Sequence, residues 1–328
     1  MIETTPAHPF AQRLRQLPDS RLLRADQPTG APLICMPEVE AQTEHYLAIE
    51  HGDSADRGML TGALGGGCLL IFGSFSLAFF LDNRPEPALT SLVILMLAFV
   101  IPLLWETLRP MPLPILLNRR TRELYFEQEG QLYHTPWDGI AAAAHAFHTV
   151  GPHTGGMRHA ALEVLLHRFG HPGEQVLINL GSPIGKRLDM QLGFWEYLRA
   201  YMDNGPWFDA EGNPSNSNAF NQSLIDVRKR RGQWTRLQWR DIKEQYKANN
   251  GRNFLSSADV ALLLGGMLLA PVNALQNFTY TIAKRRAPLY WPALIRERLR
   301  PDGPTSRLVD LEQEPVPPKT GRSSADAR

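Results

Sequence analysis

Two long uncharged stretches, close together in the sequence, constrain this chain more than any other feature. Residues 58–81 contain no Asp, Glu, Lys or Arg, and neither do residues 88–105. Because about 20 apolar helical residues cross a hydrocarbon core about 30 Å thick, each stretch can span a bilayer. The sequence DNRPEP between them, residues 82–87, contains three charged side chains and two prolines and predicts a tight polar turn. Residues 58–105 are therefore predicted to form a transmembrane helical hairpin.

The alternative is a pair of helices buried in a large soluble core. Such helices usually carry a polar stripe, and residues 91–105 carry almost none, which favours the membrane. Basic residues prefer the cytoplasmic side of a membrane. Arg57 precedes the first stretch and a group of arginines follows the second, whereas the turn contains only Arg84. The group that follows consists of Arg109, Arg119, Arg120 and Arg122. Both ends of the hairpin are therefore expected to be cytoplasmic.

Three glycines recur at every fourth position of the first stretch, at Gly58, Gly62 and Gly66. This spacing places them on one face of a helix, where small residues let two membrane helices approach closely. The expected partner is the second helix of the same hairpin. A seam between two copies of the chain, giving a homodimer, is the alternative.

The rest of the chain has the composition of a protein in water. Charged residues make up 20% of the 328 residues, and the formal net charge is +1, so nothing in the charge balance favours nucleic acid. The first twenty residues are polar and interrupted by proline, unlike a secretory signal. The two cysteines, Cys35 and Cys68, cannot build a disulfide framework or a four-cysteine zinc site.

Residues 111–205 are predicted to form a small antiparallel sheet closed by one helix. Alternation and turn residues predict five strands, at residues 124–127, 131–134, 140–147, 161–168 and 175–180. Glu129 and Gly130 should form the turn between the first two strands. Apolar residues from Leu188 to Met202 then follow a helical period, and Gly205 should end that helix.

The stretch NRRTRELYFEQEGQLYHTPWDGI resembles the opening of pleckstrin-homology-like domains of bacterial membrane proteins, with Trp137, Asp138 and Ile140 as the fold motif. The wider layout is similar to a poorly characterised proteobacterial family with an N-terminal two-helix membrane hairpin and a later Trp-Pro step, here Trp291 and Pro292. The resemblance implies a bacterial inner-membrane location. It also implies a link to type VI secretion, because genes of that family often lie beside spike and effector genes.

A basic helix is predicted at residues 224–248, after a turn-rich linker at residues 212–223. Its candidate contact residues are Arg228, Lys229, Arg230, Arg231, Trp234 and Trp239. One interpretation is a helix that lies on anionic lipid headgroups, since basic and tryptophan side chains favour that surface. The other is a solvated helix that packs its apolar face on the domain, and the sequence leaves both open.

Residues 260–282 form a third uncharged segment, long enough to span but polar in its second half. Lys284, Arg285 and Arg286 would become periplasmic if it crossed once from the cytoplasm, which the positive-inside rule disfavours. A re-entrant segment, an in-plane segment or one buried against the hairpin is therefore favoured over a third span. The proline-rich tail, residues 301–328, is expected to be disordered.

No sequence motif indicates catalysis or a metal. Seven of the ten histidines lie between His134 and His171, but their spacing does not match a ligand pattern. His145 and His148 are expected on opposite faces of a strand, and Glu163 and His167 on one face in a weak contact. The triplet at residues 65–67 lacks the Lys-Ser/Thr of a phosphate loop, and Ser182 lacks the glycine of a nucleophile elbow.

The sequence thus predicts an α+β membrane protein of five parts: a cytoplasmic segment (1–57), the hairpin (58–105), a pleckstrin-homology-like domain (111–205), a helical region (212–300) and the tail (301–328). The expected function is non-enzymatic binding of a protein partner, as an immunity or accessory protein for a type VI effector. The alternative is a lipid-sensing or scaffolding module. Membrane lipid is an expected partner in both cases, and no cofactor is expected.

Overall fold

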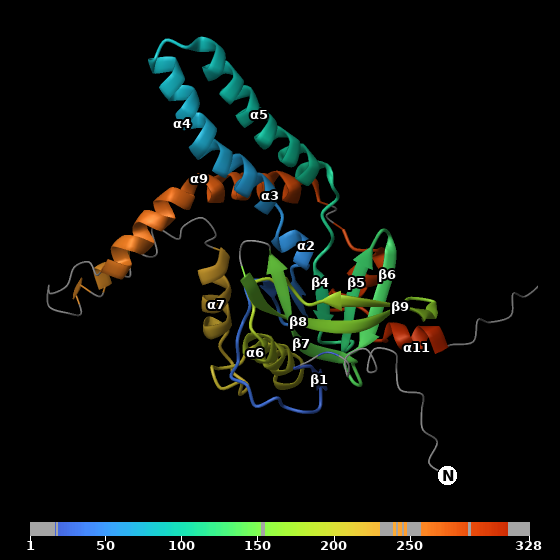
Figure 1. Ribbon diagram of the computed structural model, residues 1–328. Helices are drawn as coiled ribbons and strands as arrows, with labels where there is room; N and C mark the ends of the chain where they lie inside the picture. The colour runs from blue at the N-terminus through green and yellow to red at the C-terminus, as the bar shows by residue number, and fades with distance from the viewer. Residues whose placement is uncertain are drawn as a thin grey trace, which may run out of the picture.

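The computed structural model describes residues 17, 19–151, 155–229, 239–240, 242–244, 246–247, 257–287 and 290–313. The chain is α+β: a hairpin of two long helices rises from one side of a curled antiparallel sheet, and further helices pack on the sheet and at the base of the hairpin (Figure 1). The predicted fold class is confirmed at this level.

The described residues form one nine-stranded sheet in the order β1-β7-β8-β6-β5-β4-β3-β2, with β9 paired to β8. Every pairing is antiparallel. The strands are β1 (Arg21–Leu23), β2 (Val39–Gln42), β3 (Tyr46–Ile49), β4 (Ile115–Asn118), β5 (Glu123–Gln128), β6 (Gln131–Pro136), β7 (Ala142–Gly151), β8 (Gly155–Arg168) and β9 (His171–Asn179).

The described part of the segment before the hairpin, residues 19–57, contributes to this sheet, so it is not a unit separate from the later domain. It supplies β1, β2 and β3, and β3 pairs with β4 from Tyr46↔Asn118 to Ile49↔Ile115. The hairpin is therefore an insertion between two adjacent strands and is not N-terminal. The domain predicted at residues 111–205 contributes only β4 to β9, so a pleckstrin-homology-like layout describes part of the sheet at most.

The predicted hairpin of β5 and β6 is confirmed. Its turn residues Glu129 and Gly130 both have positive φ, 53° and 78°, as a two-residue turn that matches strand twist requires. The three later predicted strands are also present as β7, β8 and β9. β7 and β8 are longer than predicted, because their pairing continues to Gly151↔Gly155.

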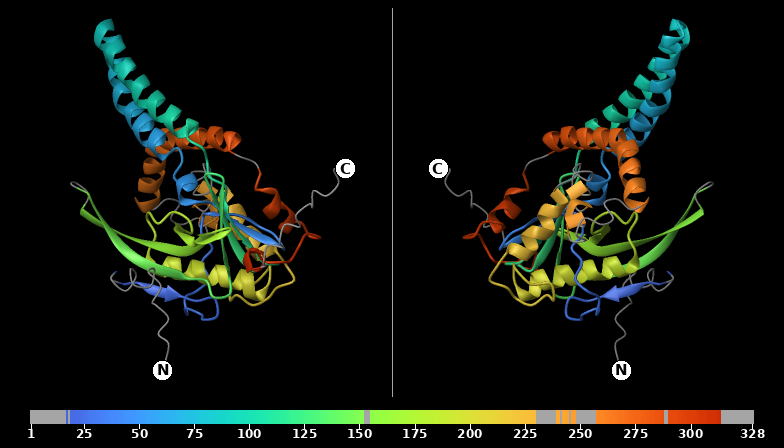
Figure 2. Two further views of the ribbon diagram at one scale, coloured as in Figure 1. Left: turned by 90° about the vertical axis from the view of Figure 1, so that its right-hand side faces the viewer. Right: turned by 90° about the vertical axis from the view of Figure 1, so that its left-hand side faces the viewer.

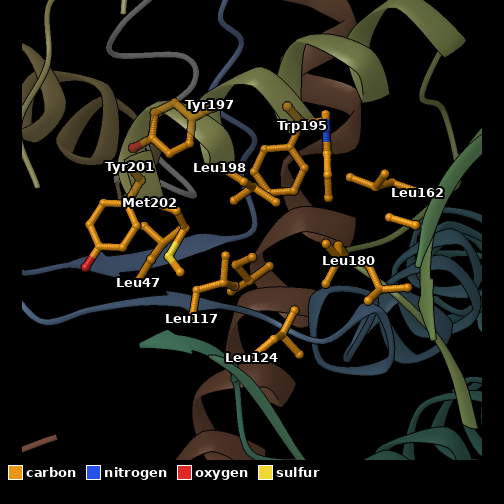
Figure 3. Close-up of a cluster of buried hydrophobic side chains, with 14 of the residues drawn as sticks. Leu47, Leu117, Leu124, Leu162, Leu180, Trp195, Tyr197, Leu198, Tyr201 and Met202 are labelled. Atoms are coloured by element: carbon orange, nitrogen blue, oxygen red, sulfur yellow. The ribbon is translucent and has the colours of Figure 1, made fainter. Parts of the chain in front are cut away.

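The main core lies between the sheet and α6 (Leu188–Arg199), which continues as the π-turn η2 (Ala200–Asn204). This is the helix predicted from residues 188–202, and Gly205 follows it with φ 125°. Trp195 lies beside Leu162 and Leu180, whereas Leu198 and Met202 point toward the inward leucines of β3, β4 and β5 (Figure 3). Those leucines are Leu47, Leu117 and Leu124, all fully buried.

The hairpin consists of two antiparallel helices. The first runs from Met59 to Leu81 as α3 (Met59–Thr61), the π-turn η1 (Gly62–Gly66) and α4 (Gly67–Leu81), after a short α2 (Gly52–Ala55). The second is α5 (Pro85–Leu108), which begins within the predicted DNRPEP turn because proline suits the first helical turn. The turn is thus only residues 82–84, where Asn83 has φ 54°.

The helices after the sheet are α7 (Ala219–Lys229), α9 (Ser257–Arg286), α10 (Ala293–Arg298) and α11 (Leu308–Gln313). α9 contains Pro271, bends, and lies across the base of the hairpin (Figures 1 and 2). The prediction of disorder from residue 301 is wrong for α11, because Leu308 is fully buried on the sheet. Residues 314–328 lie outside the described residues.

Candidate functional site at the base of the hairpin

Both hairpin helices expose apolar side chains along their length. In the most apolar 18-residue stretch of each helix, only 11% of the residues of the first helix and 17% of those of the second are buried. Ile71, Leu77 and Leu97 are each more than half exposed. The alternative of buried soluble-core helices therefore does not hold. Among the described helices, these two are long and apolar enough to cross a membrane, and α9 does not meet the same criterion.

A buried carboxylate joins the two helices at their base. Glu106 of α5 is only 4% exposed and accepts hydrogen bonds from the backbone N–H groups at the start of the first helix. Its Oε1 lies 3.0 Å from the nitrogen of Gly58 and 3.2 Å from that of Leu60, and its Oε2 lies 2.9 Å from that of Thr61. These amides have no partner within the helix, so the carboxylate acts as a cap supplied by the other helix.

Arg57 completes this junction from the preceding residue. Its guanidinium donates to the backbone oxygens of Glu106 and Pro110, at 3.0 Å each, and the residue is 4% exposed. The last turn of α5 and the chain that leads to β4 are therefore held against the start of the first helix. From the sequence, Arg57 served only to predict the orientation of the hairpin in the membrane.

The glycine stripe packs against α9, not against the second hairpin helix as predicted. A Cβ added at Gly58 would collide with the carbonyl oxygen of Gln276. One added at Gly62 would lie 2.7 Å from the carbonyl oxygen of Val272, and one at Gly66 would lie 2.6 Å from the Cα of Val272. The close approach expected of small residues is present. Its partner is the third segment, which also occupies the face that the homodimer alternative would use.

Two polar contacts tie α9 to the sheet. Tyr280 donates to the Glu50 carboxylate at 2.7 Å, and Lys284 forms an ion pair with Glu40 on β2 at 2.5 Å. Burial, together with Glu50, raises the pKa of Tyr280 to about 12. Among the arrangements predicted for residues 260–282, the structure shows the segment packed against the base of the hairpin. Lys284, at the basic end of α9, contacts the sheet.

About half of the predicted basic helix, residues 224–248, lies outside the described residues. Arg230, Arg231 and Trp234 lie there, and α7 ends at Lys229, one residue after Arg228. Trp239 is described, is 40% exposed, and has the Lys243 ammonium 5.8 Å from its ring centre. The choice between a lipid-facing and a domain-packed helix stays a prediction.

The residues of the fold motif, Trp137, Asp138 and Ile140, lie in the core or pair with neighbouring side chains of the domain. Trp137 is fully buried, with its ring centre 5.1 Å from that of Trp195 on α6. Asp138 pairs with Arg122 at 2.7 Å, and Ile140 lies in the main core. Trp291 is buried in a second core on the other face of the sheet, and Pro292 precedes α10.

The predicted strand faces hold for both histidine pairs, but the predicted contact between Glu163 and His167 is not present among the described residues. His145 is buried and His148 exposed, as expected for opposite faces of β7. His167 does not contact Glu163, which instead lies 3.9 Å from His145. His167 contacts Glu312 of α11, 3.1 Å away, in a cluster that also contains His134. Spacing along the sequence could not find this cluster, because β6, β8 and α11 meet only in the folded chain.

Comparisons of the chain with protein-family models, with curated proteins and with solved structures find no match.

Proposed function

We propose that this chain is a bacterial inner-membrane protein whose hairpin spans the bilayer with both ends in the cytoplasm. The α+β domain then lies against the cytoplasmic face, where it binds a protein partner without catalysing a reaction. The distribution of arginines supports this orientation, with one at the hairpin tip and several at the base. Trp105 also lies at the base, 56% exposed and 5.8 Å from the Arg109 guanidinium, as is common at a membrane–water interface.

The observation that carries this proposal is the junction of Arg57, Glu106 and α9. A simple tether needs only a flexible linker between membrane and domain. Here buried hydrogen bonds and a helix packed on both parts fix the hairpin to the sheet. A partner that binds this domain would be held at a defined distance from the bilayer and in a defined orientation. Such a task requires an interface and no catalytic group.

For the partner, we propose a type VI effector or a component of its secretion apparatus. The resemblance of the layout to the proteobacterial family supports this choice. An immunity role would then act by occlusion: the membrane-held domain binds the toxin or blocks its insertion.

The first test is purification of the tagged, detergent-solubilised protein from its native cell, followed by mass spectrometry. We expect a neighbouring gene product at near one-to-one ratio. Recovery of lipid and the protein itself alone would favour the lipid-sensing alternative.

The second test measures protection. We expect cells that lack the protein to be killed by sister cells that fire the neighbouring effector. Glu106→Ala should weaken protection, because it loosens the domain from the hairpin, while the exposed Glu86→Ala should not. Full resistance of the deletion strain would exclude the immunity role.

A further inference from the structure

Three side chains from distant parts of the chain meet where α11 packs on the sheet. The Nε2 atom of His134 lies 3.2 Å from one oxygen of Glu312, and the Nε2 atom of His167 lies 3.1 Å from the other. All three potential ligand atoms are within 4.8 Å of one another. Two imidazoles and a carboxylate thus converge on one small volume.

The fold holds this arrangement from both sides. His134 on β6 and His167 on β8 are direct cross-strand partners, with ring centres 4.2 Å apart. Glu312 is fixed on α11, where it also accepts a hydrogen bond from the backbone of Gly170 at 2.6 Å. Burial alone would raise the pKa of the Glu312 carboxyl, but the hydrogen bonds from Gly170 and the two histidines lower it.

A second carboxylate lies behind His134. Oε1 of Glu123 is 3.5 Å from the Nδ1 atom of His134, and both side chains are fully buried. Glu123 is itself fixed, because it accepts hydrogen bonds from the backbone of Leu308 at 2.9 Å and of Val309 at 3.2 Å. His134 therefore lies between two carboxylates, with one at each ring nitrogen.

A neutral imidazole cannot satisfy both neighbours. It carries one N–H, so the other nitrogen turns a lone pair toward a carboxylate. An unfavourable contact of this kind is costly in a buried site. A cation at Nε2 removes the conflict: the lone pair binds the cation, and Nδ1–H faces Glu123. A carboxylate behind a metal-binding histidine is a common arrangement in metalloproteins.

We propose that His134, His167 and Glu312 bind a divalent transition-metal ion of the zinc type, with Glu123 orienting His134. Two nitrogens and one oxygen form a donor set that suits zinc, and a fourth position remains for solvent. Ligands about 2.1 Å from a tetrahedral ion lie about 3.4 Å apart. Each histidine nitrogen lies at a similar distance, 3.2 and 3.1 Å, from one of the two Glu312 oxygens, and the three potential ligand atoms lie within 4.8 Å of one another. Bound there, the ion would fasten α11 to β6 and β8. The inference does not depend on the identity of the protein partner.

The competing occupant is a second proton on His134, which would also satisfy both carboxylates. Metal analysis distinguishes the two. The full-length protein, purified in detergent through a tag without histidine, is analysed for metals and then titrated with Zn²⁺ alone after chelation. We expect about one zinc per chain and a rise in melting temperature on adding Zn²⁺. His167→Ala and Glu312→Gln should abolish both, and His148→Ala, an exposed histidine on β7, should leave both unchanged.

Glu123→Gln tests the orienting role separately, with an expected 10- to 100-fold loss of zinc affinity. Circular dichroism verifies that each variant is folded. The metal content of the wild-type protein tests the proposal even if a variant fails to fold. A wild-type chain that contains no metal and shows no response to Zn²⁺ would overturn the proposal. Equal zinc binding by wild type, His167→Ala and Glu312→Gln would overturn it too.

Discussion

The junction between the hairpin and the domain depends most on the side chain of Glu106. A glutamate near the end of an apolar helix is costly unless its charge is matched. Here three backbone amides and the Thr61 hydroxyl satisfy it.

Replacing Glu106 by alanine should destabilise the protein by about 3 kcal/mol, because buried amides at the start of the first helix would lose their acceptor. The measurement is the unfolding free energy in detergent. Glu86→Ala, at the exposed start of α5, is the control and should cost about 0.5 kcal/mol or less. An equal loss in the two variants would contradict the role assigned to Glu106.

A second residue-scale prediction concerns Asp138 of the fold motif. Its hydrogen bonds with Arg122 lower the pKa of its carboxyl below the ordinary value of 3.8, and Arg122 also pairs with Asp203 at the end of the closing helix. Because the folded-state pKa is depressed, the pair contributes stability above the ordinary pKa and loses it as pH falls through the folded value.

We therefore expect Asp138→Asn to lower stability at pH 7 and to have less effect near pH 3. The melting temperature of both proteins, measured from pH 7 to pH 3, checks this. A constant difference between wild type and variant across that range would show that Asp138 contributes by packing alone. The side chain is 55% exposed, so the effect should be modest.

At the scale of elements, the contact between the first hairpin helix and α9 decides how the parts are joined. The glycine spacing correctly predicts a close helix–helix approach. The choice of partner depends on where α9 is placed by Tyr280 and Lys284, and that placement needs the sheet. A periodic stripe specifies a face of a helix and says nothing about what covers that face.

Gly66→Ala and Gly67→Ala form a matched pair for this contact. At Gly66 the added methyl would overlap the backbone of Val272, whereas at Gly67 nothing lies within 4 Å. We expect Gly66→Ala to destabilise the protein by about 1–3 kcal/mol through overpacking. Gly67→Ala should be neutral or stabilising by up to about 1 kcal/mol, since alanine favours a helix. Thermal unfolding in detergent measures both, and similar shifts in the two variants would argue against the α9 contact.

At the scale of the whole molecule, the proposed topology places the hairpin tip on one side of the membrane and everything else on the other. Single cysteines test this in a chain with Cys35→Ala and Cys68→Ala. Asn83→Cys should react with an impermeant maleimide in spheroplasts. Ser217→Cys and Asp302→Cys, which lie before and after α9, should react only after permeabilisation. If Asp302→Cys reacted in intact spheroplasts and Ser217→Cys did not, α9 would cross the membrane.

Local signals were enough to predict several elements. The two apolar stretches predict the hairpin helices because a length of uncharged residues is a local property. The turn at Glu129 and Gly130 and the closing helix from Leu188 follow from turn chemistry and periodicity in the same way. The short strands β1 to β4 were missed, because three or four residues carry too little periodicity and gain their stability from pairing across the sheet.

The sequence by itself therefore determined which segments are apolar, that the two hairpin stretches and the segment from Leu188 are helical, and that the chain turns at Glu129 and Gly130. Only the tertiary structure decided that β3 and β4 pair across the inserted hairpin, that α9 covers the glycines, and that Glu312 reaches the two histidines. The physical reason is common to all three. Each contact joins residues far apart in the chain, and its free energy depends on burial and hydrogen bonding that exist only once the sheet has formed.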